Sequence, residues 1–272
     1  MFGMARLTPK QRMIRLRESQ ILDLARPMIA QGGLAALSMD AIAQELQTAK
    51  GTIYNHFPNK EEIVLALAVQ AVDRRLELFN HAVMMRGTSR QRIAAIGIAC
   101  EVYVDVLPDL FRAEQIIRHE TVWGKTTEKR KEILRNCEGR CMHTVAGVAR
   151  DAVAAGDMVL EAAHQIEDIV FGLWSLVYGG MVLETTSPSL VDVGIVDSRA
   201  AIRRNCNSML DGLKWQPLYE PEPYSIWVQQ VRTHLLANCP PAGAVAVEEP
   251  DPIRAETKPR KLAKPAKLGG RE

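Results

Sequence analysis

The chain has 272 residues, of which 47% are hydrophobic and 24% charged, and a formal net charge of +2. These proportions are those of a folded globular protein, and they exclude collagen-like, coiled-coil and wholly disordered chains. The length allows one large domain or two smaller ones.

The charge is distributed unevenly along the chain. Residues 1–60 carry eight Lys or Arg against four acidic residues, and residues 257–272 carry six against one, so the two ends are +4 and +5 and the middle is −7. This asymmetry favours contact with a polyanion at the ends only, although most basic runs are merely solvated.

The cysteines and the apolar segments indicate where in the cell the protein is expected to be. Five cysteines are scattered rather than spaced as a disulfide framework, which favours a reduced, cytoplasmic protein, and the N-terminal residues show no apolar leader. The most apolar stretch, Ile166 to Leu183, contains Glu167 and Asp168, so we expect a buried helix and no membrane partner.

The first predicted helix begins near Pro9. Apolar residues recur at helical spacing from Ile21 to Ile29, and the pair Gly32-Gly33 supplies the stop. Pro27 lies inside this pattern and lacks the backbone donor that a helix needs, so we expect a kink or an early end there.

Two short helices follow, at 38–46 and 49–56. Ser38 is the expected N-cap of the first, and Ala49, Ile53 and Phe57 share one face of the second. Asn59 then caps a long helix that reaches about Val83, with Glu62 placed to complete a capping box.

The rest of the pattern is helical as well, and no segment with the period of a strand stands out. The further predicted helices span roughly 89–106, 109–122, 127–155, 160–184, 198–214 and 223–237. The fold is therefore predicted to be all-α, with a head at 1–60, a helical body at 61–237, and a disordered basic tail at 238–272 that is rich in Pro, Ala, Glu and Lys.

The two short helices have the dimensions of a helix-turn-helix. With Ala49 and Ile53 buried, Lys50, Thr52, Tyr54 and Asn55 would project outward into a major groove. Lys50 offers a cation to phosphate or guanine, the Thr52 methyl can touch a thymine, and Gly51 lets the backbone approach closely.

The residues from Leu37 to Leu46 (LSMDAIAQEL), followed by those from Lys50 to Ile63 (KGTIYNHFPNKEEI), resemble the DNA-binding domain of the tetracycline-repressor (TetR) family of bacterial transcription regulators. The resemblance covers about residues 15–70. It implies a three-helix head and a divergent helical domain that binds a ligand. Two positions depart from the family pattern, since Gln47 stands in the turn where Gly is usual, and Ala49 stands where Ser or Thr usually caps, with Thr48 as an alternative cap.

The resemblance implies contacts with double-stranded DNA from both helices of the motif and from the start of the next helix. The residues concerned are Ser38, Lys50, Gly51, Thr52, Tyr54, Asn55, His56 and Lys60. Taken singly, Tyr54 or His56 would more often pack at a helix end. The occurrence of all these residues together and in this order favours DNA contacts over packing at a helix end.

A single recognition helix has little specificity, so we expect a homodimer that binds a palindromic operator. The resemblance places its interface on the helices near 160–184 and 198–214, through Ile169, Gly172, Leu173, Val177, Gly180, Met181, Ile202, Met209 and Leu213. An intramolecular core would use part of this face.

The resemblance also implies a small effector that weakens DNA binding, which would make the protein a repressor. The candidate pocket residues are Tyr103, Phe111, Ile116, His119, Trp123, Met142, Trp174 and Tyr178, and they favour an apolar or aromatic effector. Taken singly, each of these side chains would more often belong to a plain core.

Other chemistry is poorly supported. Cys137, Cys141 and His143 lie close in sequence but lack the spacing of a zinc site, and no phosphate loop, nucleophile elbow or metalloprotease motif is present. We therefore predict no cofactor, no metal and no enzymatic activity. The alternative is a ligand-insensitive, nucleoid-associated architectural DNA-binding protein, which the basic tail from Lys258 to Lys267 would suit.

Overall fold

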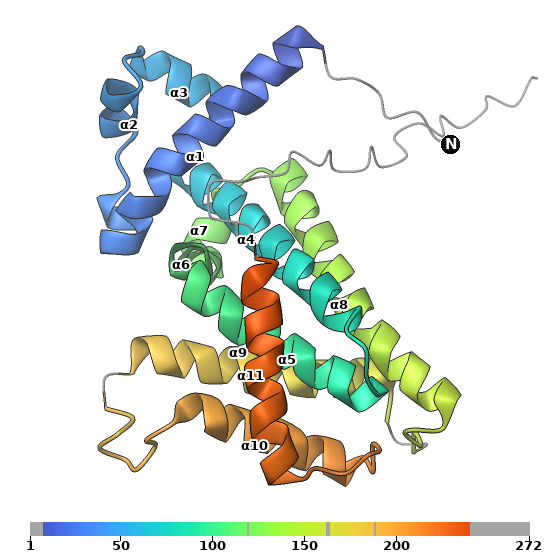
Figure 1. Cartoon of the computed structure of the whole chain (residues 1–272). Helices are drawn as coiled ribbons and strands as arrows, with labels where there is room; N and C mark the ends of the chain where they lie inside the picture. The colour runs from blue at the N-terminus through green and yellow to red at the C-terminus, as the bar shows by residue number, and fades with distance from the viewer. Residues whose placement is uncertain (1–7, 119, 162–163, 188, 240–272) are drawn as a thin grey trace, which may run out of the picture.

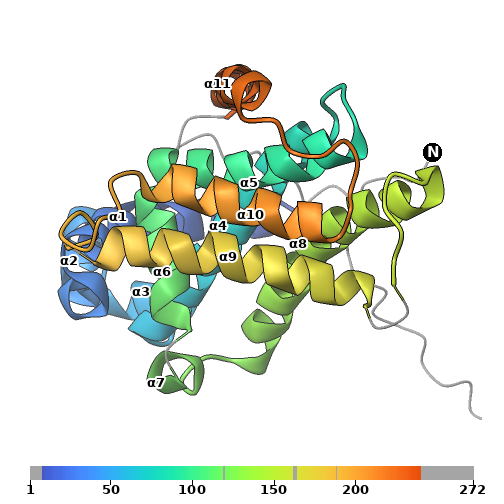
Figure 2. The ribbon, with the colours of Figure 1, turned by 90° about the horizontal axis from the view of Figure 1, so that it is seen from below.

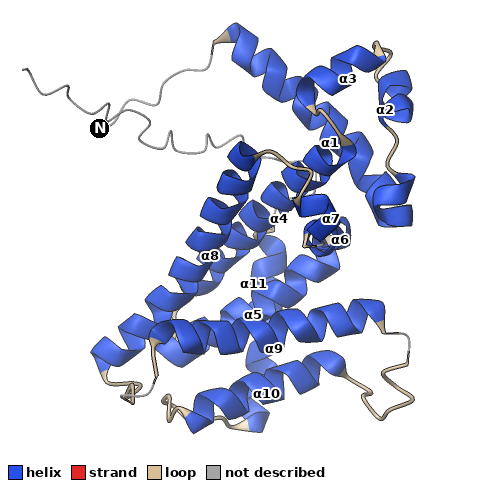
Figure 3. Ribbon diagram, turned by 180° about the vertical axis from the view of Figure 1, so that it is seen from behind, coloured by secondary structure: helices blue, strands red, loops and turns tan. Residues whose placement is uncertain are grey.

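The computed structural model describes residues 8–118, 120–161, 164–187 and 189–239, and the regular elements in these ranges are all helices (Figure 3). The elements are α1 (Pro9–Ala36), α2 (Met39–Glu45), α3 (Lys50–His56), α4 (Lys60–Val83), α5 (Ser89–Val106), α6 (Pro108–Ile117), α7 (Glu120–Trp123), α8 (Glu128–Ala155), α9 (Ile166–Thr186), α10 (Ser198–Gly212) and α11 (Pro221–Ala237). The all-α prediction is confirmed.

Local sequence signals set many of the helix ends. Thr8 and Gln11 form a capping box at the start of α1, and Thr88 and Gln91 form another at α5. Proline occupies the first helical position of α1, α6 and α11, where its missing N–H costs nothing. Such signals made these starts predictable to within a few residues.

Helix α1 continues past Pro27 and breaks at the glycine pair instead. Gly32 has φ −143° and Gly33 has φ +64°, which is a left-handed conformation that favours glycine. The expected stop is thus found at Gly32-Gly33, and the expected early end at Pro27 is not. The break at the two glycines changes the direction of the chain, and the short helical segment that ends at Ala36 then leads into α2.

The first three helices form the head, and the long α4 leads from it into the body (Figure 1). In the body, α4 packs against α5, α6 and α8. Helices α9 and α10 lie side by side across the end of the body that is farthest from the head (Figure 2), and α11 crosses α5 on another side.

Two predicted helices have different bounds in the structure. The predicted 109–122 segment divides into α6 and the short α7. The predicted 160–184 segment begins only at Ile166, and α9 is not the buried helix that we expected, because 22% of its apolar window is buried inside this chain. Helix α9 is long and apolar enough to cross a membrane by length and composition alone, but it packs here against α8 and α10.

Candidate nucleic-acid interface and ligand cavity

The outer face of α3 consists of polar and glycine residues. Lys50, Gly51, Tyr54 and Asn55 are exposed and Thr52 is half-buried, whereas Ile53 and Phe57 are completely buried. We call the five residues Lys50, Gly51, Thr52, Tyr54 and Asn55 the recognition face. Burial of the two apolar side chains fixes the rotation of α3, and this rotation turns the recognition face outward.

Two interactions organise the recognition face. The Lys50 Nζ lies 2.7 Å from Asp40 Oδ1 and 5.8 Å from the centroid of the Tyr54 ring. The hydrogen bond to Asp40 raises the pKa of Lys50, so the ammonium group stays charged at neutral pH. Because both partners are largely exposed, a phosphate or a guanine can replace the Asp40 carboxylate at little cost.

The turn before α3 lacks the side-chain cap that the resemblance led us to expect. Gln47 adopts φ +49°, a left-handed conformation, and Ala49 is the N-cap residue of α3 and makes no side-chain cap. Thr48 precedes this position, so it is not the cap. Instead, backbone bonds hold the turn, from Thr48 N to Ala43 O (2.9 Å) and from Gln47 N to Gln44 O (3.0 Å).

The other predicted DNA contacts lie at helix ends. Ser38 caps α2, its Oγ accepting from Ala41 N at 3.2 Å, which leaves the hydroxyl proton free to donate to a phosphate. His56, at the end of α3, has only 15% of its side chain exposed, and its Nδ1 lies 3.9 Å from Glu18. Lys60 is half-buried in the first turn of α4.

A network of polar contacts, which we call the junction, joins the head to the body between the start of α4 and the start of α8. Asn59 caps α4 as expected, but Glu62 does not complete a capping box, because its carboxylate accepts from Thr127 N at 2.5 Å and pairs with Arg130 Nε at 3.0 Å. Asn59 Nδ2 also donates to Lys125 O at 3.0 Å. No local sequence signal indicates that Glu62 reaches another helix.

Arg130 is the centre of the junction. Besides Glu62, its guanidinium contacts Glu18 of α1 at 3.4 Å, donates to the His56 carbonyl at 3.4 Å and lies 4.7 Å from the centroid of the Phe57 ring. One side chain of the body thus touches the first helix, the end of the recognition helix and the start of α4.

A second head-to-body contact runs between α1 and α6. Arg26 Nε donates to Asp109 Oδ2 at 2.8 Å, and Arg26 is 8% exposed. Gly33 faces the side chains of Arg112 and Ile116, and a Cβ there would lie 3.8 Å from Ile116 Cδ1. Helix α6 is therefore in direct contact with the head.

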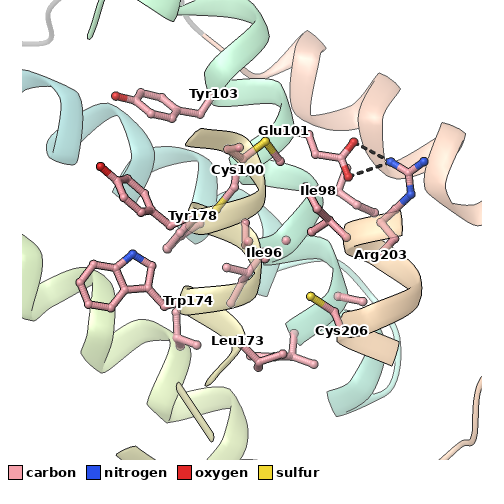
Figure 4. Close-up of a pocket in the computed structure, with 18 of the residues that line it drawn as sticks. Ile96, Ile98, Cys100, Glu101, Tyr103, Leu173, Trp174, Tyr178, Arg203 and Cys206 are labelled. Atoms are coloured by element: carbon pink, nitrogen blue, oxygen red, sulfur yellow. Dashed lines mark hydrogen bonds and ion pairs between the residues drawn. The ribbon is translucent and has the colours of Figure 1, made fainter. Parts of the chain in front are cut away.

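The body contains an apolar cavity between α4, α5, α6, α8, α9, α10 and α11 (Figure 4), with about 1000 Å³ of empty space including its mouth. Figure 4 shows Tyr103, Trp174 and Tyr178 along one side and Glu101, Arg203 and Cys206 along the other. A cavity lined mostly by apolar and aromatic side chains, with a few polar groups among them, is typical of small-molecule sites.

Five of the eight predicted pocket residues line the cavity, namely Tyr103, Phe111, Met142, Trp174 and Tyr178. Ile116 lines a different hollow beside α1, and Trp123 lies under the Lys131 ammonium at 5.4 Å. His119 lies outside the described residues. Sequence reasoning missed Glu101, Arg203 and Tyr224, because the charged pair and the α11 residue reach the cavity only through long-range packing.

Four of the nine predicted dimer residues are buried within the chain. Ile169, Leu173, Met181 and Ile202 are buried, and of these Leu173, Met181 and Ile202 line the cavity together with Val177. A Cβ added to Gly172 or Gly180 would collide with Met209 or Ile202, so these glycines bring α9 close to α10 of the same chain. Leu213 is half-buried at the end of α10. Part of the set thus packs within the chain, as the intramolecular alternative expected.

The described residues contain no group of three His, Cys, Asp or Glu side chains that could hold a metal ion. Cys141 Sγ lies against Val72 O at 3.8 Å, Cys137 Sγ contacts Arg140, and His143 Nδ1 lies 2.6 Å from Gly139 O. The three side chains that sequence proximity suggested as ligands therefore have separate partners.

Comparison with known proteins identifies the head. Residues 21–67 match the model for bacterial regulatory proteins of the tetR family. The chain is 30% identical over 77 residues to the fatty acid metabolism regulator protein of Bacillus subtilis, which covers 28% of this chain and 40% of that protein. It is 24% identical over 140 residues to the HTH-type transcriptional regulator UidR of Escherichia coli, covering 52% of this chain and 68% of UidR.

The fold extends the likeness to the body. The crystal structure of the regulator FadR from Bacillus subtilis in complex with stearoyl-CoA matches with a TM-score of 0.51 at 18% identity, covering 74% of this chain and 98% of FadR. The head thus resembles known regulators in sequence, and the body resembles them in fold. The head of the chain therefore belongs to the tetR family of bacterial regulatory proteins.

Proposed function

We propose that this regulator is a homodimeric repressor that binds a palindromic operator through α3 and is released by a small apolar effector. The observation that carries the proposal is the recognition face, which is polar and outward while Ile53 and Phe57 anchor the same helix in the head. A helix of this kind, placed by a preceding helix and a tight turn, is built to enter a major groove.

Dimerisation is proposed through the exposed stripe of α9. Phe171, Ser175, Gly179 and Leu183 follow one another at intervals of four residues, and Phe171 and Leu183 are 63% and 55% exposed. A Cβ on Gly179 would meet no atom within 4 Å, so this surface is open to a second helix. An apolar helix face of this length is costly to leave in water, and a partner's α9 would cover it.

Release by an effector is proposed through α4 and α6. Helix α4 begins at the junction and further along contributes Arg75 and Phe79 to the cavity. Helix α6 holds the Arg26 of the head through Asp109 and contributes Phe111 to the cavity. A ligand that prefers one position of these helices changes DNA affinity by its differential binding energy, about 1–3 kcal/mol for a typical coupled pair of sites.

The experiment is an in vitro selection from random duplexes by the purified protein, followed by footprinting of the selected sequence. We expect a palindrome with two protected half-sites, and loss of the footprint when an effector found by thermal-shift screening is added. Binding of many unrelated sequences that no effector reverses would instead support the architectural role.

A further inference from the structure

We infer that the cavity admits only ligands whose buried part is uncharged, with an apolar body and few neutral hydrogen-bonding groups. This inference deepens the proposed function by naming the chemical class of the effector. It rests on how the charged and aromatic side chains around the cavity are already paired.

Both cationic residues that line the cavity are neutralised by carboxylates. Arg75 Nη1 holds Glu114 at 2.7 and 3.0 Å, and Arg203 Nη1 holds Glu101 at 2.7 and 2.8 Å. Glu114 and Glu101 are each 2% exposed. Each pair is neutral overall, so neither arginine is left as an uncompensated charge for an ionic ligand.

An anionic ligand would bring a second negative charge to a guanidinium whose charge a buried carboxylate already balances. Removing Arg75 from Glu114 leaves that carboxylate buried without a counter-charge, which is strongly unfavourable. Burial already raises the pKa of Glu114 against the opposing effect of Arg75, and the same is true of Glu101 beside Arg203. A ligand carboxylate would therefore be a buried charge without a counter-charge of its own.

A cationic ligand is opposed by the guanidinium groups that already lie over the aromatic rings. Arg118 lies 5.5 Å from the Trp174 centroid and 5.1 Å from the Tyr178 centroid, and Arg75 lies 5.9 Å from the centroid of Tyr103. The aromatic rings along this side of the cavity thus already make cation–π contacts with arginine side chains. A second cation placed over the same rings would be repelled by these guanidinium groups.

The remaining polar groups in the cavity stay neutral. Burial raises the pKa of Cys100 to about 12 and that of Cys206 to about 11, and it raises the pKa of Tyr178 as well. These thiols and hydroxyls can donate to, or accept from, a ligand hydroxyl or carbonyl. They add hydrogen bonding without charge, as a neutral effector requires.

The test compares three probes with the same naphthalene body, measured with the full-length protein at pH 7 by isothermal titration calorimetry. The probes are 2-naphthol, which is neutral, 2-naphthoate, which is anionic, and trimethyl(2-naphthyl)ammonium, which is cationic. We expect 2-naphthol to bind at least about tenfold more tightly than either ion. Equal or tighter binding of an ion, or no binding of 2-naphthol at about 1 mM, would overturn the inference.

A substitution sharpens the same test. Glu114→Gln leaves Arg75 without its carboxylate, so we expect 2-naphthoate to gain at least about tenfold in affinity relative to 2-naphthol. Glu128→Gln, which removes an exposed carboxylate paired with Arg135 on α8, is the matched control and should leave the ranking unchanged. An unchanged ranking in a folded Glu114→Gln protein would contradict the role given to the pair.

The two proposals fail separately. The probe ranking does not involve DNA, so a wrong ranking overturns the ligand class while leaving sequence-selective DNA binding intact. Absence of any selected DNA sequence would overturn the proposed function, whatever the ranking of the probes.

Discussion

The head and the body of this protein carry their functional residues in different ways. In the head, the recognition face comes from one short helix, and its residues lie within six positions of one another. In the body, the cavity takes its lining from seven helices, and its charged pairs join residues 39 and 102 positions apart.

This difference separates two physical tasks. Reading DNA needs a rigid rod with polar side chains turned outward, which local helical periodicity can supply. Enclosing a ligand needs packed surfaces from several helices, and only the assembled core places them. Substitutions on the recognition face should therefore change DNA binding alone, whereas substitutions in the body should change stability, ligand binding or the coupling between ligand and DNA binding.

The largest effect should come from Tyr54→Ala. The Tyr54 side chain is 40% exposed, so its removal should leave the melting temperature nearly unchanged. Operator affinity, measured by fluorescence anisotropy, should fall by about 100-fold or more, because the dimer would be deprived of two interactions with DNA, each contributing about 1–3 kcal/mol. Ile226→Ala, at an exposed position on α11, is the control. An unfolded Tyr54→Ala protein would mean that the ring belongs to the core.

The next effect should come from the junction. Arg130→Met removes the contacts with Glu18, Glu62 and the His56 carbonyl, so the end of α3 is held less firmly. We expect operator affinity to fall about tenfold, or about 1.4 kcal/mol, and 2-naphthol affinity to stay the same. Arg135→Met, which removes only an exposed ion pair on the same helix, should match the wild type. Equal operator affinity of the two variants would show that the junction does not position α3.

Alkaline pH should weaken the body. Cys100 lines the cavity, and its pKa is raised from 9.0 to about 12 by burial, so the unfolded chain loses this proton before the folded one does. The protonated Cys100 thiol therefore makes its full contribution to the free energy of unfolding below about pH 9. This contribution is lost as the pH rises toward 12, at about 1.4 kcal/mol per pH unit. Between pH 9 and 10, the free energy of unfolding measured by urea denaturation should fall less in Cys100→Ala than in the wild type. Parallel curves would contradict this role for the thiol.

Lys60→Ala and Thr52→Ala separate two kinds of DNA contact in the head. Lys60→Ala should weaken binding to all sequences alike and reduce the slope of log affinity against log salt by about 0.9 for each phosphate that is no longer neutralised. Thr52→Ala should instead change base preference at one position of each half-site. Identical salt slopes and identical selected sequences for both variants would rule out these roles.

The smallest effect should come from Gln47→Gly in the turn. Gln47 adopts a left-handed conformation that costs a residue with a side chain about 1 kcal/mol. Glycine removes that cost but gives the unfolded chain more freedom, so we expect a gain of about 0.5 kcal/mol in the free energy of unfolding. Gln44→Gly inside α2 is the control and should destabilise the head by a similar amount. A loss of stability in both variants would mean that the turn is not strained.

Much of the head could be predicted from the sequence, because its signals are local. The Ser38 and Asn59 caps, the Gly32-Gly33 break and the spacing of Ile53 and Phe57 each act within a few residues. The side of α9 that meets α10 could not be predicted, because Gly172 and Gly180 fit a contact with another chain as well as they fit Met209 and Ile202 of the same chain. The expectation that Glu62 completes a cap was wrong for the same reason, since nothing near it in sequence reveals Arg130.

The central claim is that the recognition face of α3 reads duplex DNA twice in each assembly. Its most direct test is hydroxyl-radical footprinting of the wild-type protein and of Tyr54→Ala on the sequence that the wild type selects. We expect two symmetric half-sites centred about one helical turn or a multiple of it apart for the wild type, and none for the variant. A single protected site, or the same footprint from both proteins, would contradict it.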